Sequence, residues 1–303
     1  MNKPNQPTHD AEPKALRLEN EHAPTVHPTA VVHPTATLGS GVTVGPYAVV
    51  GQRVTVGARS ALHNHATVLG PAVIGEDNEV FPYAVLGAEP QDLKYKGHDT
   101  ALVVGDRNKF REHSTVHRGT QFGDAATRIG SDCLLMVGAH VAHDCRLDDE
   151  VVIANNTMIG GHCHLEFGST VAGGSGIHHF TTIARLAFVG GMSRISKDVP
   201  PFCIVEGNPA QVRKVNSVAL ARRRFPIEQV EALRAAFRLL FRSSDLTTLE
   251  AIEQIRGEAH SPENRDAQHA FQPALELCAF LERCDTGVHG RYLEAERQDY
   301  RRH

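Results

Sequence analysis

The 303-residue sequence contains no tryptophan, and aromatic residues make up only 6% of it. A core of large aromatic side chains is therefore not expected, and the 26 glycines favour a repetitive structure built from small residues. The six cysteines form no CxxC pair, which indicates neither a disulfide framework nor a zinc ribbon and favours a reducing compartment. The formal net charge of −4 gives no support to nucleic-acid binding.

Long apolar runs are also missing. The sequence has no stretch of about 18 apolar residues, so we expect no membrane-spanning helix. Its first 24 residues are polar and rich in proline, without the apolar segment of a secretory signal. We therefore expect residues 1–25 to be a disordered extension and the protein to be cytoplasmic.

Aliphatic residues recur at every sixth position over most of the chain. A period of six fits neither the turn of a helix nor the simple alternation of a strand. It predicts triangular coils in which each six-residue side turns one aliphatic residue inward, stacked about 4.8 Å apart like hydrogen-bonded strands. We therefore predict an all-β solenoid, a parallel β-helix of about nine or ten coils, over residues 26–206. The aliphatic series runs over Val26, Val32, Leu38, Val44, Val50, Val56, Leu62, Val68, Ile74, Val80 and Leu86, and again over Ile129, Leu135, Val141, Leu147, Ile153, Ile159, Leu165, Val171, Ile177, Ile183, Val189 and Ile195.

Two interruptions of the repeat predict loops outside the coils, near residues 89–100 and 121–128. Irregular insertions on a rigid scaffold are common places for function. Cys133, Cys145 and Cys163 fall at the position of the small inward side chains, so we predict that they are core residues.

Beyond residue 206 the period changes to that of a helix, as in Val230, Leu233 and Phe237. This predicts a helical domain over residues 207–284, followed by a mobile tail over 285–303. Residues 213–242 hold eight Lys or Arg against two Glu. Such a run is common on a solvated helix face, and it also suits an acidic partner.

The chain has 19 histidines, and some of them are spaced by nearly one coil. His143, His162 and His178 are separated by 19 and 16 residues, so we expect them near one line on three successive coils. His140 shares a coil with His143, and Asp144 follows His143 directly. Single exposed histidines are ordinary surface residues, whereas a column of three beside a carboxylate indicates a site.

Two chemistries could use such a column. A neutral imidazole oriented by a carboxylate can act as a general base toward a hydroxyl or an amine. Histidines on neighbouring coils can also bind zinc and leave a position open for water, as in the gamma-class carbonic anhydrases, whose scaffold is similar. The pairs His140/His143 and His162/His164 lack the separation that this class uses, which does not favour a metal.

Several short strings resemble the UDP-N-acetylglucosamine acyltransferase family of lipid A biosynthesis. They are QDLKY at 91–95, HRGT at 117–120 and AHVAHDC at 139–145, with further matches at 161–162, 177–180, 207–208 and 222–223. The resemblance covers residues 26–243. It implies a left-handed β-helix with a C-terminal helical domain, assembled as a homotrimer with active sites between neighbouring subunits.

The resemblance also implies a reaction and its residues. A 3-hydroxyacyl group would pass from acyl carrier protein to the 3-position of a UDP-amino-sugar, without a metal or other cofactor. His143 matches the general base, Asp144 its orienting partner, and Gly161 the backbone amide that stabilises the oxyanion. Gly191 matches a position that sets acyl-chain length. The matched substrate-binding positions are Gln91, Asp92, Lys94, His117, His140, His162, His178, His179, Gly191, Asn208, Asn216, Arg222 and Arg223.

Two departures from the family pattern indicate a divergent member. Val218 stands where the family usually has Glu, and His179 where Gln is commoner. Three alternatives remain open: another acyl- or acetyltransferase acting on a nucleotide sugar, a non-catalytic β-helix scaffold, and a metal lyase like the gamma-class carbonic anhydrases. A scaffold would need neither His143 nor Lys94. The sequence leaves open whether the acceptor atom is oxygen or nitrogen, because one histidine base serves either.

Overall fold

The structure of the protein is a computed structural model that describes residues 23–261 and 268–297. Most of the predicted N-terminal extension, residues 1–22, lies outside the described residues, as do residues 298–303 of the predicted tail. No helix in the described part of the chain is long and apolar enough to cross a membrane.

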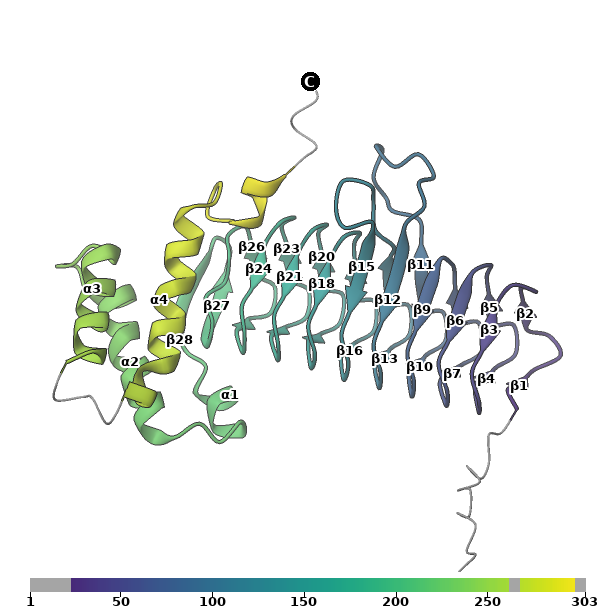
Figure 1. Ribbon diagram of the computed structural model, residues 1–303, viewed down its shortest axis with the longest axis horizontal. Coiled ribbons are helices and arrows are strands. Elements are labelled where there is room, and N and C mark those ends of the chain that lie inside the picture. Colours follow the sequence, from purple (N-terminus) through teal and green to yellow (C-terminus); the bar gives the residue numbers. More distant parts are fainter. Residues whose placement is uncertain (1–22, 262–267, 298–303) are drawn as a thin grey trace, which may run out of the picture.

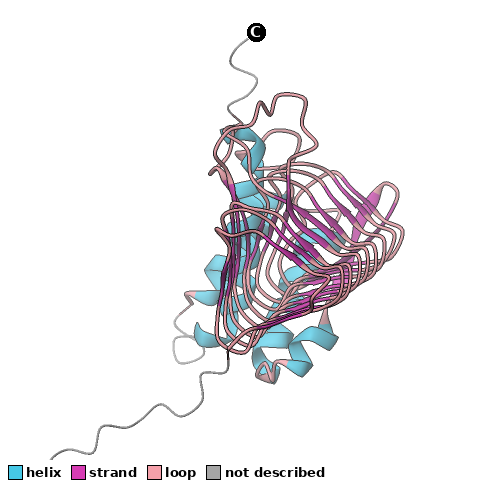
Figure 2. Cartoon of the chain, turned by 90° about the vertical axis from the view of Figure 1, so that its right-hand side faces the viewer, coloured by secondary structure: helices cyan, strands magenta, loops and turns pink. Residues whose placement is uncertain are grey.

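Within the described residues, short strands form three sheets, one along each face of a triangular prism (Figure 2), and every pair is parallel except β27 with β28. The first sheet contains β1 (Thr25–Val26), β4 (Thr43–Val44), β7 (Ala61–Leu62), β10 (Glu79–Val80), β13 (Lys109–Phe110), β16 (Leu134–Leu135), β19 (Val152–Ile153), β22 (Thr170–Val171), β25 (Phe188–Val189), β27 (Cys203–Gly207) and β28 (Ala210–Val215). The second contains β2 (Val31–Val32), β5 (Val49–Val50), β8 (Thr67–Val68), β11 (Val85–Ala88), β14 (Thr115–His117), β17 (His140–Val141), β20 (Met158–Ile159), β23 (Gly176–Ile177) and β26 (Arg194–Ile195). The third contains β3 (Thr37–Leu38), β6 (Val54–Val56), β9 (Ala72–Ile74), β12 (Ala101–Val104), β15 (Ala126–Ile129), β18 (Arg146–Leu147), β21 (His164–Leu165) and β24 (Thr182–Ile183). This is the predicted parallel β-helix.

The inward aliphatic side chains form one continuous core along the prism. Val44, Leu62 and Val80 are register partners on successive coils and are at most 2% exposed. Cys133 and Cys163 are each 1% exposed, which confirms their predicted place in the core. Burial raises the pKa of the Cys133 thiol to about 12, so this cysteine packs as a small apolar side chain.

In the part of the chain that the structure describes, four α-helices close one end of the prism (Figure 1). They are α1 (Ser217–Arg222), α2 (Ile227–Arg242), α3 (Thr248–Ala259) and α4 (Gln272–Asp285). Phe202 of the last coil is buried in one cluster with Leu233 of α2 and Leu277 of α4. The helices therefore pack directly on the solenoid rather than forming a separate body.

Three predicted boundaries were wrong in detail. The second loop ends at residue 125, because Ala126–Ile129 already pairs with Ala101–Val104. The helical part begins at Ser217 rather than at residue 207, because β27 and β28 first form an antiparallel hairpin. Residues 285–297 are not a mobile tail: they fold back onto the last coils and include a short helix, η2 (Leu293–Glu296), because Arg291 and Tyr292 find polar partners there.

Candidate active site

One corner of the prism, where strands of the second sheet end, holds most of the predicted catalytic residues. The coils that contain β17, β20 and β23 turn here through Asp144, His162 and Phe180, whose φ angles are +58°, +60° and +60°. Each of these residues occupies the left-handed region that a corner of this kind demands. Backbone hydrogen bonds from His162 to His143 and from Phe180 to Gly161 hold the three turns in register.

This register corrects the predicted column of histidines. His143 and His162 do lie together, with ring centroids 5.1 Å apart. His178 does not continue that line, because its neighbour on the preceding coil is Gly160. Its Nδ1 is 3.0 Å from the carbonyl oxygen of His179, and the two rings lie 3.8 Å apart.

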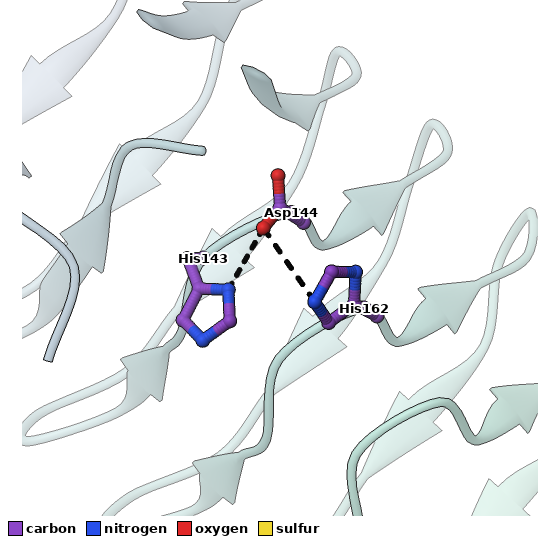
Figure 3. Close-up of side chains that lie close together, drawn as sticks. All are labelled: His143, Asp144 and His162. Carbon is purple, nitrogen blue, oxygen red and sulfur yellow. Dashed lines mark hydrogen bonds and ion pairs between the residues drawn. The ribbon is translucent and has the colours of Figure 1, made fainter. Parts of the chain in front are cut away.

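His143 and Asp144 form the hydrogen-bonded pair that the sequence predicted (Figure 3). His143 Nδ1 is 2.8 Å from Asp144 Oδ2, and the Asp144 side chain is only 1% exposed. Asp144 also accepts hydrogen bonds from the backbone N–H of Thr120 at 2.8 Å and from its hydroxyl at 2.6 Å. Because the Asp144 carboxylate accepts a hydrogen bond from Nδ1–H, the proton of the neutral imidazole is assigned to Nδ1 and the basic lone pair to Nε2.

His162 completes the cluster from the next coil. Its Nε2 lies 3.6 Å from Asp144 Oδ2, and its ring stacks on Phe180 at 4.4 Å with an angle of 5°. Ligand atoms of His143, Asp144 and His162 all lie within 4.8 Å of one another, which makes them the group of described residues that could hold a metal ion.

The ring of His143 occupies the space that a side chain at position 161 would need, so only glycine fits there. A Cβ built on Gly161 would lie 2.7 Å from His143 Cε1 and 2.9 Å from Nε2. The backbone N–H of Gly161 has no backbone partner within the part of the chain that the structure describes. A donor beside the imidazole is therefore available to a ligand.

His140 and His117 lie on the same face of the second sheet. The two rings meet edge to face at 4.9 Å, and His140 Nδ1 is 2.8 Å from the hydroxyl of Thr115. His117 is only 5% exposed, and burial lowers its pKa to about 4. We predicted that His117 binds substrate; in the structure its nearly buried ring packs against His140. Burial also lowers the pKa of His140, with a further contribution from His143.

His179 has the second strongly shifted histidine pKa. Burial first, and then the neighbouring charges of His178 and Arg297, lower it to about 4. His179 is therefore neutral at physiological pH and can offer a lone pair or an N–H to a ligand.

The first loop, residues 89–100, carries Gln91, Asp92 and Lys94. Gln91 and Lys94 are exposed, and Asp92 accepts a hydrogen bond from the backbone N–H of Lys94 at 2.9 Å. Arg118 anchors the loop from below, with hydrogen bonds of 3.0 Å to Glu89 and 3.1 Å to the hydroxyl of Tyr95. Both loops project from the prism edge (Figure 1). The first loop follows β11, two coils before the catalytic corner that follows β17, and the second loop follows β14, one coil before it.

The remaining predicted residues lie away from this corner. Gly191 is exposed at another corner, beside the backbone oxygen of Gly173. Asn208 is exposed at the tip of the β27–β28 hairpin.

At the start of the helical part, Asn216 caps α1 and donates to the carbonyl of Leu186 at 2.9 Å, so its amide is engaged within the chain. Arg223 pairs with Glu150, whereas Arg222 is exposed. Within the single chain, these residues thus do not reach His143.

Three contributors to the site were not singled out from the sequence. Thr120 holds Asp144 and Arg118 holds the first loop, and both belong to the HRGT string that was used only as a motif. The third contributor is the C-terminal segment, which lines a cavity of about 360 Å³ beside the cluster. Residues lining it include Phe122, Asp144, His162, Phe180, Tyr292 and Arg297.

Comparison with known proteins agrees with this architecture. Residues 198–289 match the family model described as UDP N-acetylglucosamine O-acyltransferase, domain 2, and residues 126–161 match the bacterial transferase hexapeptide model. A protein of Synechocystis, named acyl-[acyl-carrier-protein]–UDP-N-acetylglucosamine O-acyltransferase, is 53% identical over 239 residues, which cover 78% of this chain and 86% of the relative.

Two solved structures extend the similarity to three dimensions. The UDP-N-acetylglucosamine O-acyltransferase of Moraxella catarrhalis is 36% identical, with a TM-score of 0.77 over 84% of this chain and 96% of that chain. The Arabidopsis UDP-N-acetylglucosamine acyltransferase is 32% identical, with a TM-score of 0.72 over 88% of this chain and 98% of that chain.

Hexapeptide coils, a helical cap and a hydrogen-bonded His–Asp pair on a coil corner define an acyltransferase built on a left-handed parallel β-helix, as predicted. Within that class, the chain belongs to the family of acyl-[acyl-carrier-protein]–UDP-N-acetylglucosamine O-acyltransferases.

Proposed function

We propose that this acyltransferase moves a 3-hydroxyacyl chain from acyl carrier protein to the 3-hydroxyl of UDP-N-acetylglucosamine, in the cytoplasm, as the first step of lipid A biosynthesis. The observation that carries the proposal is the 2.8 Å contact between His143 Nδ1 and the buried Asp144 carboxylate. It leaves the basic lone pair on Nε2, next to Gly161.

The chemistry follows from these groups. Nε2 of His143 removes the proton of the acceptor hydroxyl while the oxygen attacks the thioester carbonyl carbon. The Gly161 N–H donates to the oxygen that becomes negative, and Asp144 stabilises the imidazolium. When the C–S bond breaks, the imidazolium returns its proton to the carrier thiolate, so His143 ends the cycle neutral.

A homotrimer with shared sites accounts for the residues that one subunit keeps apart. Lys94 is exposed on a projecting loop, and Arg222 is exposed at the helical end. We infer that a neighbouring subunit brings Asp92 and Lys94 to His143, and that the basic residues of the helical part meet the carrier protein and the diphosphate.

Product analysis tests the proposed reaction. Wild-type protein is incubated with UDP-N-acetylglucosamine, or with its 3-amino analogue, and a panel of 3-hydroxyacyl carrier-protein thioesters of different lengths. We expect ester formation at the 3-position, with one preferred chain length. Transfer to the 3-amino analogue alone would replace the acceptor, and no transfer with any donor would overturn the proposal.

Subunit mixing tests the shared site. His143→Ala and Lys94→Ala chains are each expected to be inactive alone, because each lacks one half of every site. Refolding them together creates some interfaces with both residues intact, so partial activity should return. Absence of complementation, with trimers formed normally, would place Lys94 and His143 of one chain in one site.

A further inference from the structure

The chain continues past the end of the matched family domain at residue 289 and returns to the catalytic corner. In Figure 1 the segment that follows α4 lies along the prism edge from which the loops project. Residues 290–297 therefore form a part of the site that the match to the family domain does not cover.

Buried polar contacts anchor this segment to the last coil. The Arg291 side chain is 6% exposed and donates to the backbone oxygen of Ser196 while it pairs with Glu294. The backbone N–H of Tyr292 donates to Asp198 at 2.9 Å, and the N–H of Asp198 donates to the carbonyl of Gly290 at 2.8 Å. The anchor thus fixes the segment before it reaches the catalytic corner.

Arg297 makes the contact with the corner itself. Its guanidinium carbon lies 5.3 Å from the centroid of the Phe180 ring, within the range of a cation–π interaction. Glu294 pairs with Arg297 at 3.4 Å, and the Arg297 side chain is only 16% exposed. Phe180 in turn stacks on His162, whose Nε2 is 3.6 Å from Asp144.

We propose that Arg297 is a positioning residue, which acts through Phe180 to hold the His162 ring beside Asp144. The inference rests on the proposed function for its kinetic consequence, but its geometry does not. Without Arg297, Phe180 loses the charged group on its ring and the cavity beside His162 loses one wall. His162 then has fewer contacts to keep its orientation.

Kinetics of Arg297→Ala and Arg297→Lys test the proposal. For Arg297→Ala we expect kcat/KM for the nucleotide sugar to fall about tenfold, the size of a desolvated cation–π contact. Arg297→Lys keeps a cation over Phe180 and should recover most of the loss. Arg256→Ala, which removes an exposed ion pair with Glu282 on the helical end, is the matched control and should behave as wild type.

A double-mutant cycle separates positioning from direct ligand contact. If Arg297 acts through Phe180, then Arg297→Ala should have little further effect in a Phe180→Leu background. Additive losses would mean that Arg297 works independently of Phe180 and would overturn the proposal. The proposal would also be overturned if kcat/KM of Arg297→Ala stayed within twofold of wild type. It would be overturned too if Arg297→Ala and Arg297→Lys lost kcat/KM equally and both had a lowered Tm.

Histidine NMR decides the geometry without any assay of acyl transfer. A ring stacked on Phe180 at 4.4 Å places the His162 ring protons in the shielding region of that aromatic ring. We expect this shielding in wild type and in Arg256→Ala, and its reduction in Arg297→Ala. Unchanged His162 shifts in Arg297→Ala would overturn the proposal, even if wild type showed no acyl transfer at all.

Discussion

The ring of His143 lies over Gly161, one coil further along the prism, at the place where any other residue would carry its Cβ. That Cβ would be 2.7 Å from Cε1 and 2.9 Å from Nε2 of the imidazole, closer than van der Waals contact allows. Gly161 therefore has two functions at this corner: its lack of a side chain leaves room for the His143 ring, and its own backbone N–H can donate a hydrogen bond to a ligand.

Replacing Gly161 by alanine tests this coupling. The added methyl forces the His143 ring away from Gly161. The imidazole and the Gly161 N–H can then no longer contact the reacting groups of one bound substrate at the same time. We expect kcat to fall about a hundredfold or more, comparable to the loss of one oxyanion donor. Gly257→Ala in α3, where a Cβ meets nothing within 4 Å, should keep full activity. Normal kcat in Gly161→Ala would contradict the arrangement.

Thr120 offers a test of how the Asp144 carboxylate is held. Thr120→Val removes the 2.6 Å hydroxyl contact and leaves the backbone donor in place. Loss of one hydrogen bond to a charged group is worth about 1.5–3 kcal/mol, so we expect kcat to fall roughly tenfold or more with KM little changed. Steady-state kinetics measure this, with the exposed Thr43→Val as control. A rise in KM alone would show that Thr120 serves binding instead.

Buried neutral His117 predicts a pH dependence of stability. Its folded pKa of about 4 is below the unfolded value of about 6.5, so between these pH values only the unfolded chain takes up a proton. The contribution of His117 to the free energy of unfolding is fully present above pH 6.5 and is lost as the pH falls toward 4. The loss is at most about 1.4 kcal/mol per pH unit.

Denaturant titrations at several pH values between about 4.5 and 7 measure this slope. Wild type should lose stability on acidification, and His117→Gln, which cannot titrate at this position, should lose distinctly less. Parallel curves for the two proteins would show that His117 is not the group responsible.

The solenoid was predictable because its signal is local and repeated. Each inward residue, such as Val44 or Leu62, contributes to the same six-residue period, so single exceptions do not hide it. The pairing of His143 with Asp144 was also within reach, since the two are adjacent in the chain. The length of one coil already places His178 in register with Gly160 rather than with His143, so its displacement from the histidine column follows from the sequence.

Other features have no periodic signal. Thr120 reaches Asp144 only because a loop of irregular length closes over the next coil. Arg291 and Arg297 stand in a polar segment that composition alone suggests is mobile, and their partners at Ser196 and Phe180 are far away in the chain. Contacts of this kind depend on the completed fold, which explains why the tail prediction was wrong.

Chelator treatment tests the role of the His143–Asp144–His162 cluster. Asp144 Oδ2 already accepts the Thr120 hydroxyl at 2.6 Å and lies 2.8 Å from His143 Nδ1, so a metal would have to displace both contacts. We expect protein dialysed against EDTA to keep its acyl-transfer rate, and elemental analysis of purified protein to find less than stoichiometric zinc. Activity that disappears with the chelator and returns with zinc would make the cluster a metal centre.

The central claim is that Nε2 of His143 is the base for acyl transfer, and His143→Ala tests it most directly. The rate of transfer from 3-hydroxyacyl carrier protein to UDP-N-acetylglucosamine is compared between this variant and wild type at equal Tm. A loss of several orders of magnitude in kcat, with substrate binding retained, is the predicted result. A variant that keeps kcat within about tenfold of wild type would contradict the account.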